Sequence, residues 1–308
     1  MEENRATSVL LSIFASDILP IFLIAGVGFL LARYLGVNAT ALAHTVFYAL
    51  VPCLVFNMLV TARMTGLQFG RLALFNLLIL LAMGLLARLV AMPLGLSRPE
   101  LSAFLLVVMF SNSGNYGLPV VLFAFGPDAL APATIFFVAG SLLTYTVGVF
   151  VAATGRRSVT GAIGRILKVP AIYAVAAAAI IVATGVHPPP AVMRPVELLS
   201  NAALPTMILV LGMQLDRAAM PERPSVVVAA VGLSLVIAPF VALGLASAVG
   251  VSGAARQAGV TLASMPVAVV TTILAVEFET APAFVTSAVF ASTLLSPFTL
   301  TPLIAYLR

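Results

Sequence analysis

The sequence predicts an all-α membrane protein in which ten transmembrane helices form two inverted five-helix repeats. Composition is the first indication: 62% of the 308 residues are hydrophobic, 8% are charged, and the mean hydropathy is +1.19. Soluble domains carry about a quarter charged residues. Long apolar runs and prolines that recur at matching places in the two halves are the second and third indications.

Ten apolar segments, separated by charged residues and Pro/Gly clusters, are each long enough to cross a hydrocarbon core of about 30 Å. Their runs are continuous rather than alternating, which argues against a β-barrel. Together they take about 200 residues and leave no room for a separate soluble domain. In chain order the predicted spans are 9–33, 40–60, 71–95, 101–126, 132–153, 169–186, 193–213, 225–249, 255–277 and 282–306.

An internal repeat is indicated by four pairs of prolines at equivalent span positions. The pairs are Pro20 with Pro170, Pro52 with Pro205, Pro119 with Pro266, and Pro132 with Pro282. Residues 1–153 form the first predicted repeat, 154–168 a short basic loop, and 169–308 the second repeat. Because each repeat has an odd number of spans, the second enters the membrane from the opposite face, as in many secondary transporters.

Lysine and arginine counts predict the orientation. The connections on the side of the two termini carry six Lys and Arg, and those on the other side carry nine, with the densest cluster in the central loop. Since basic residues favour the cytoplasm, we expect this loop to be cytoplasmic and both termini to lie outside. The acidic N-terminus lacks the features of a cleaved signal peptide, so we expect a multi-pass protein of the cytoplasmic (inner) membrane.

The predicted fourth and ninth spans carry the clearest functional signal. Proline and glycine interrupt both in mid-membrane, which is tolerated only where the backbone is buried in protein or lines a wet cavity. Two such breaks would direct two half-helix N-termini at one point, a site that suits a carboxylate. The alternatives are simple kinks, or asparagines that join the helices by hydrogen bonds. The predicted binding residues are Asn112, Ser113, Gly114, Asn115, Tyr116, Gly117, Pro119, Ser264, Met265, Pro266 and Thr271.

A weaker signal comes from the second and seventh spans. Pro52 and Pro205 are predicted to disturb these helices, as Pro119 and Pro266 disturb the fourth and ninth. Asn57 follows Pro52 by about one helical turn and either lines the same cavity or forms an interhelical hydrogen bond.

Four ionisable residues, Asp17, His44, Glu197 and Glu277, lie in or near the spans and are candidates for proton or cation coupling. Each falls towards a span end, where interfacial solvation is the common explanation. The mid-membrane breaks contain no acidic residue, which argues against tight carboxylate-based coupling and leaves uniport or exchange of an organic anion open.

Enzymatic and metal-dependent functions are disfavoured. Ser113-Gly114 faintly resembles the motif of intramembrane serine proteases, but Ser111 stands where that motif has glycine, and neither histidine has an evident route to Ser113. With one cysteine and two histidines there are too few ligands for zinc. We therefore expect no enzyme, no metal, no cofactor and no nucleic-acid partner.

Several segments together resemble the auxin efflux carrier family, which includes the plant PIN-FORMED carriers and bacterial permeases for small carboxylates such as malonate. These segments are FYALVPCLVFNML, SNSGNYGLPVV, LPTMILVLGMQL, SMPVAVVTTILAVEF and STLLSPFTLTPLIAYL, in order along the chain. The resemblance implies crossing helices four and nine, a scaffold, a mobile transport domain with elevator-like alternating access, and a homodimer.

Residue by residue, the resemblance implies that Asn112 matches the asparagine that helps to hold the substrate carboxylate. Pro266 matches the family's helix-nine proline, and Glu277 matches the acidic residue near the end of that helix. Thr271 replaces a second proline of the plant carriers, and the central loop is far shorter than theirs. Both departures favour a bacterial-type permease whose substrate need not be auxin.

Two alternatives remain open from the sequence. The bile acid:sodium symporter family is similar in architecture, but its members resemble sodium-coupled systems with acidic groups at the crossing, and no acid lies beside Ser264-Pro266. A channel or pore protein should show a continuous polar stripe, and none is evident.

Overall fold

A computed structural model describes residues 2–61, 66–155, 170–186, 188–215 and 223–308. The described chain is almost entirely helical, and within it the only β-type pairing is an isolated bridge between Ser111 and Val267. The predicted all-α membrane class is confirmed at this level. Most of the predicted loop 154–168 lies outside the described residues.

The helical segments in the first half of the chain follow the five predicted spans closely. Several spans include a π-helical or 3-10 turn, and such turns carry the label η. In order the segments are α1 (Glu2–Ile13), η1 (Phe14–Ile18), α2 (Leu19–Leu35), α3 (Ala39–Thr45), η2 (Val46–Leu50), α4 (Val51–Thr61), α5 (Gly66–Ala91), η3 (Met92–Leu94), α6 (Arg98–Met109), η4 (Ser113–Gly117), α7 (Leu118–Phe125), η5 (Pro127–Ala129), α8 (Leu130–Leu143) and η6 (Thr144–Gly148). The segment α9 (Val149–Thr154) completes the fifth span.

The second half is more regular. Its described segments are α11 (Pro170–Thr184), α12 (Pro190–Leu215), α13 (Pro224–Gly232), η7 (Leu233–Ile237), α14 (Ala238–Val249), α15 (Gly253–Ala263), α16 (Val270–Glu277) and α17 (Pro282–Leu307). Helix α12 continues through both Pro195 and Pro205, so Pro205 does not break the seventh span. Pro52 lies at the start of α4 and does not break that helix either.

Seven continuous stretches among the described residues are long and apolar enough to cross a membrane. The predicted spans missing from this set are 101–126, 169–186 and 255–277. The first and third are interrupted, so each consists of two short helices. The second has a described helix, α11, of 15 residues.

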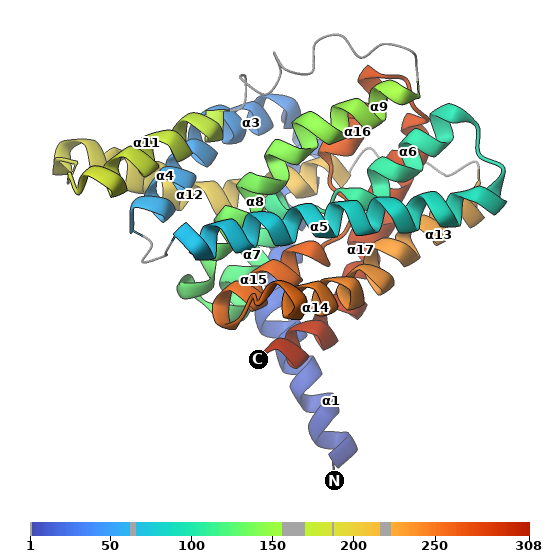
Figure 1. Ribbon diagram of the computed structural model, residues 1–308, viewed down its shortest axis with the longest axis horizontal. Helices are drawn as coiled ribbons and strands as arrows, with labels where there is room; N and C mark the ends of the chain where they lie inside the picture. The colour runs from blue at the N-terminus through green and yellow to red at the C-terminus, as the bar shows by residue number, and fades with distance from the viewer. Residues whose placement is uncertain (1, 62–65, 156–169, 187, 216–222) are drawn as a thin grey trace.

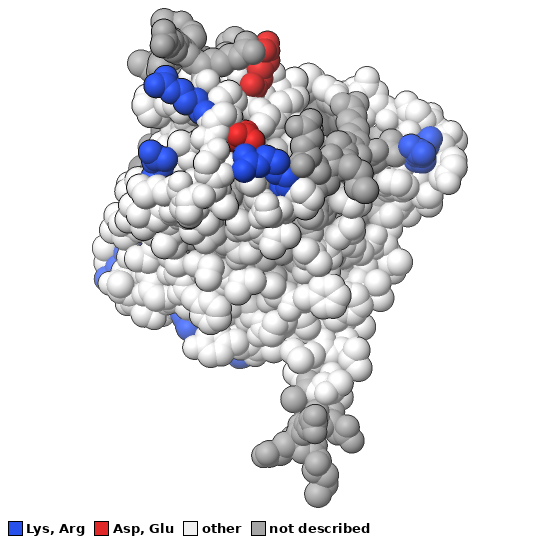
Figure 2. Space-filling view, turned by 90° about the vertical axis from the view of Figure 1, so that its right-hand side faces the viewer, with Lys and Arg blue, Asp and Glu red and all other residues white. Residues whose placement is uncertain are grey.

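The outer surface is suited to lipid. Large apolar side chains are exposed on many helices, including Leu23, Leu85, Phe240 and Phe298. Figure 2 shows charged side chains near the upper edge and a few basic ones near the lower edge, with a broad uncharged band between them. This band is what a hydrocarbon core requires, because a charge there is costly.

Helix α12 packs against α2 and α4, and α4 packs against α11; α4 and α11 lie together on the left of Figure 1. The contact of α2 with α12 depends on glycine. A Cβ atom added to Gly28 would meet the backbone of Leu209, and one added to Gly212 would meet the backbone of Ala25. These two positions therefore allow the two helix backbones to touch, as small residues do in membrane helix pairs.

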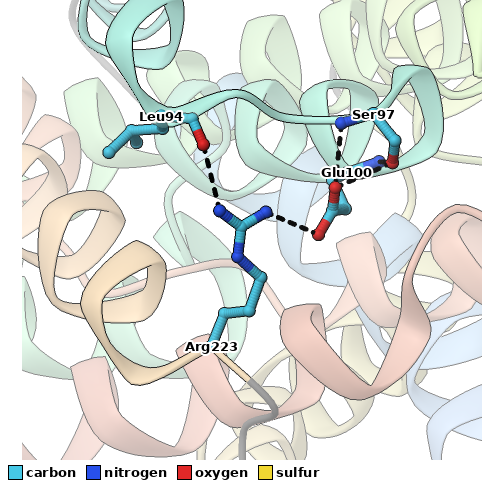
Figure 3. A network of polar contacts seen from close by, with 4 residues as sticks. All are labelled: Leu94, Ser97, Glu100 and Arg223. Carbon is cyan, nitrogen blue, oxygen red and sulfur yellow. Dashed lines mark hydrogen bonds and ion pairs between the residues drawn. The ribbon is translucent and has the colours of Figure 1, made fainter.

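A second set of helices, α5, α8, α14 and α17, packs around the interrupted segments, to which α6 and α15 belong. At one end of this set a polar network ties the start of α13 to the turn between α5 and α6 (Figure 3). Ser97 and Glu100 form a capping box at the start of α6. Arg223, which precedes α13, donates to Glu100 Oε1 at 3.0 Å and to the carbonyl of Leu94 at 3.0 Å. The network therefore fixes where α13 begins.

Another ion pair joins the N-terminal span to the end of the chain. Asp17, in η1, is 3% exposed, and its carboxylate accepts hydrogen bonds from Arg308 and from the hydroxyl of Ser16. The guanidinium of Arg308 also donates to the carbonyl of Ala124 at the end of α7. The carboxylate of Asp17 is therefore buried and paired with Arg308, and not solvated at the membrane interface as expected.

We predict that Gly28→Ala lowers the stability of the protein by about 1–3 kcal/mol, because the new methyl group has no space against α12. Gly26→Ala in the same helix is the matched control, since a Cβ atom there meets nothing within 4 Å. Thermal unfolding of the purified variants in detergent measures both. Equal melting temperatures for the two variants would contradict the close contact.

We also predict that Arg308→Met lowers the stability by about 2 kcal/mol, because it leaves a buried carboxylate without its charged partner. The double variant Asp17→Leu/Arg308→Met should recover most of the loss, since both charges are then removed. Thermal unfolding of the two single variants and the double variant measures the coupling. A double variant no more stable than Arg308→Met would show that the pair does not stabilise the fold.

Candidate functional site

The two interrupted segments cross each other at their breaks. Helix α6 ends at Met109, and the chain is non-helical up to η4; helix α15 ends at Ala263, and helix resumes at Val270. Asn112 N donates to the carbonyl of Pro266 at 2.7 Å, and Ala268 N donates to the carbonyl of Phe110 at 2.9 Å. These bonds make the antiparallel bridge between Ser111 and Val267.

Side chains complete the hydrogen bonding of the crossing. The hydroxyl of Ser111 donates to the carbonyl of Leu262 in the last turn of α15, at 2.8 Å. Val267 N donates to the hydroxyl of Ser292 in α17, at 3.1 Å. A third helix therefore supports the breaks, and backbone groups that a helix would satisfy internally are paired across the crossing instead.

The prolines act differently from what their positions predicted. Pro119 lies at the start of α7, directly after the π-helical turn η4, so the chain is helical on both sides of it. The interruption is in the residues before η4. Pro266 lies in the interruption itself and supplies the carbonyl that Asn112 N uses. The first break therefore owes its place to the Phe110–Asn112 segment and not to a kink at Pro119.

A cavity of about 420 Å³ adjoins the crossing. Its wall comes from α3, η2, α5, α8, α12 and α16 as well as from both breaks. Among the predicted binding residues, Asn112, Ser113, Gly114, Asn115 and Met265 line this cavity. Of the predicted binding residues, the structure thus brings together the polar run of the first break and one residue of the second.

The remaining predicted binding residues lie outside the lining and have other contacts. The hydroxyl of Tyr116 is 3.0 Å from Ser296 Oγ. The hydroxyl of Ser264 donates to the carbonyl of Val260, and that of Thr271 donates to the carbonyl of Ala268. Gly117 allows close packing, since an added Cβ would meet Leu262 and Met265. Pro119 and Pro266 are described above.

Asn57 does not line the cavity. Its amide nitrogen donates to Ser200 Oγ at 3.3 Å, which joins α4 to α12. This is the interhelical hydrogen bond that the sequence left open as the alternative. Of the four ionisable candidates, His44 and Glu277 line the cavity, whereas Asp17 is paired with Arg308 and Glu197 lies on the exposed surface of α12.

Electrostatically the cavity is weakly charged. No lysine or arginine occurs among the described residues of its wall, and its titratable side chains are His44, Tyr48, Tyr145 and Glu277. Asn112 is 5% exposed, and its Nδ2 has no hydrogen-bond partner within the described chain. A buried amide donor without a partner is costly, so this atom marks the place where a bound acceptor group would be stabilised.

Sequence reasoning missed two amides in the wall. Asn76, in α5, donates its Nδ2 to the carbonyl of Phe136 at 2.8 Å. Gln214, near the end of α12, has a buried Oε1 that lacks a partner in the described part of the chain. A signal for Gln214 exists: Met207, Val210 and Gln214 follow helical spacing and so share one face of α12, and all three line the cavity.

We predict that Ser292→Ala lowers the stability by about 1–3 kcal/mol, because it leaves the buried N–H of Val267 without an acceptor. Thr293→Val is the matched control, since the hydroxyl of Thr293 bonds back to Val289 within its own helix. Thermal unfolding in detergent compares the two, and the support by α17 is refuted if Thr293→Val is the more damaging change.

Comparison with known proteins agrees with a membrane carrier. The family model described as "Membrane transport protein" matches residues 13–161 and again residues 156–304. An uncharacterised transporter of Methanothermobacter thermautotrophicus is 27% identical over 287 residues, covering 91% of this chain and 93% of the relative. An uncharacterised transporter of Methanocaldococcus jannaschii is 25% identical over 267 residues, covering 84% and 86%. The predicted resemblance is thereby confirmed, and the chain belongs to the membrane transport protein family of the auxin efflux carriers.

Proposed function

We propose that the protein is a secondary transporter of a small organic anion, and specifically of a carboxylate, across the cytoplasmic membrane. The observation that carries the proposal is the unpartnered, buried Nδ2 of Asn112, which has no partner among the described residues, in a cavity beside the crossing of two broken helices. The substrate carboxylate would accept a hydrogen bond from this amide. Uptake into the cavity would therefore satisfy both groups at once.

The first break offers further donors. The first turn of η4 has no preceding helical turn to accept from its N–H groups, and the dipole of the half-helix favours an anion there. Ser113 N already donates to the carbonyl of Ser111, and Leu118 N donates back into η4, so the donors that this break offers are those of the turn that follows Ser113. The start of α16 contributes less, because Thr271 N and Thr272 N already donate to the carbonyls of Ala268 and Val269. We therefore assign the main anion contacts to the Asn112–Asn115 segment.

Alternating access by an elevator movement is the second part of the proposal. In this arrangement α2, α4, α11 and α12 form the scaffold, and the helices that surround the two breaks form the mobile body. Two features support ten spans in inverted repeats: the same family model matches both halves, and the bridge between the breaks is antiparallel. A homodimer and termini outside the cell belong to the same proposal.

We predict that Asn112→Ala weakens carboxylate binding about ten- to a hundredfold, the loss expected for one hydrogen bond to a charged group. Asn57→Ala is the matched control, because Asn57 is also a buried amide but lies outside the cavity. Thermal-shift titration with a panel of small carboxylates gives affinities, and uptake into proteoliposomes gives transport.

Three outcomes of that experiment separate the candidate functions. Saturable uptake with counterflow supports a carrier, whereas uptake without counterflow supports a channel. Strict dependence on sodium would favour a symporter similar to the bile acid carriers. Unchanged affinity and uptake in Asn112→Ala would refute the assigned site.

A further inference from the structure

The cavity contains a second unpaired polar atom, and its chemistry is opposite to that of Asn112. Oε1 of Gln214 is buried and has no hydrogen-bond partner among the described residues. An amide oxygen only accepts hydrogen bonds, whereas the Nδ2 of Asn112 only donates them. The wall thus presents one unmatched donor and one unmatched acceptor.

Nδ2 of Asn112 and Oε1 of Gln214 lie at different places along the cavity. Met207 lies beside the first break, since its Cε is 3.4 Å from a Cβ added to Gly114. Gln214 follows Met207 by seven residues on the same face of α12, which is about 10 Å along the helix axis. Because α12 is continuous over this stretch, Gln214 lies towards the far end of the cavity from the break.

An ionised carboxylate cannot satisfy both atoms, because its two oxygens are acceptors. It matches Asn112 and leaves Gln214 without a donor. The titratable groups that share the cavity are His44, Tyr48, Tyr145 and Glu277, and none of them donates a hydrogen bond to Oε1 of Gln214. A second group of the substrate, remote from its carboxylate, is therefore the complement that the described wall lacks.

We propose that Gln214 is a specificity-determining residue that selects carboxylates bearing a hydroxyl or N–H donor at the end remote from the carboxylate. This inference rests on the proposed function. It adds a second group of the substrate that the protein recognises, and it names Gln214 as the residue that binds this group. Asn112 holds the acid, and Gln214 discriminates among acids.

Three matched probe acids test the proposal: 4-hydroxyphenylacetate, phenylacetate and 4-methoxyphenylacetate. The first carries a remote donor, the second has no remote polar group, and the third carries only a remote acceptor. Calorimetric titration of the purified full-length protein in detergent gives a Kd for each acid. We expect the wild type to bind 4-hydroxyphenylacetate about three- to tenfold more tightly than either of the others, the gain of one neutral hydrogen bond.

Gln214→Met removes the acceptor and keeps the length of the side chain. We expect it to abolish the preference for the hydroxylated acid and to leave the Kd for phenylacetate within about twofold. Gln214→Glu is the second variant; it keeps an acceptor oxygen and should keep the preference while binding all three acids more weakly. Leu215→Met, at the neighbouring position of α12 but outside the described lining of the cavity, is the control and should retain the wild-type preference.

The inference and the proposed function fail in different ways. Equal affinities of the wild type for the three acids, or a preference that survives Gln214→Met, would overturn the role of Gln214 and leave carboxylate binding intact. Tighter binding of the methoxy acid would show that Gln214 donates, which also overturns it. If neither these acids nor the short pair malate and succinate bind at all, the carboxylate assignment itself falls and the inference with it.

Discussion

The backbone hydrogen bonds between the two breaks are the constraint on which the rest of this protein depends. In hydrocarbon an unpaired peptide group costs several kcal/mol, so an interrupted span cannot exist alone. In this chain the peptide groups of Phe110 and Asn112 pair with those of Pro266 and Ala268. Neither interruption is stable without the other, and the surrounding helices are arranged so that the two meet.

The crossing also decides which polar groups remain for a ligand. The peptide groups of the two breaks bond to each other and to a side chain of α17. The first N–H groups of α16 bond to carbonyl groups in the turn just before that helix. The side chains of Asn112 and Gln214 keep one atom each in the cavity that is unmatched within the described chain. Recognition by neutral amides, without lysine or arginine in the described wall, demands little desolvation of the empty site and lets a bound anion leave again.

Local signals in the sequence predicted the spans, their interruptions and the polar run Asn112–Asn115 of the site. The sequence could not reveal contacts between distant residues, which is why the pairing of Asn57 with Ser200 stayed an alternative and the pairing of Asp17 with Arg308 was not foreseen. Pro205 was expected to disturb α12 but is accommodated within a continuous helix. Gln214 was overlooked because it lies one residue beyond the predicted span, although its spacing from Met207 places it on the cavity face.

The support of the first break by residues of the second half has a consequence for biosynthesis. After Asn112 a ribosome must complete roughly 155 further residues before Pro266 and Ala268 exist, and roughly 180 before Ser292 exists. Until then the exposed peptide groups of the nascent chain need a substitute partner, such as water in the insertion channel or an assisting protein. The first half of the chain therefore reaches its stable form only after the second half has been made.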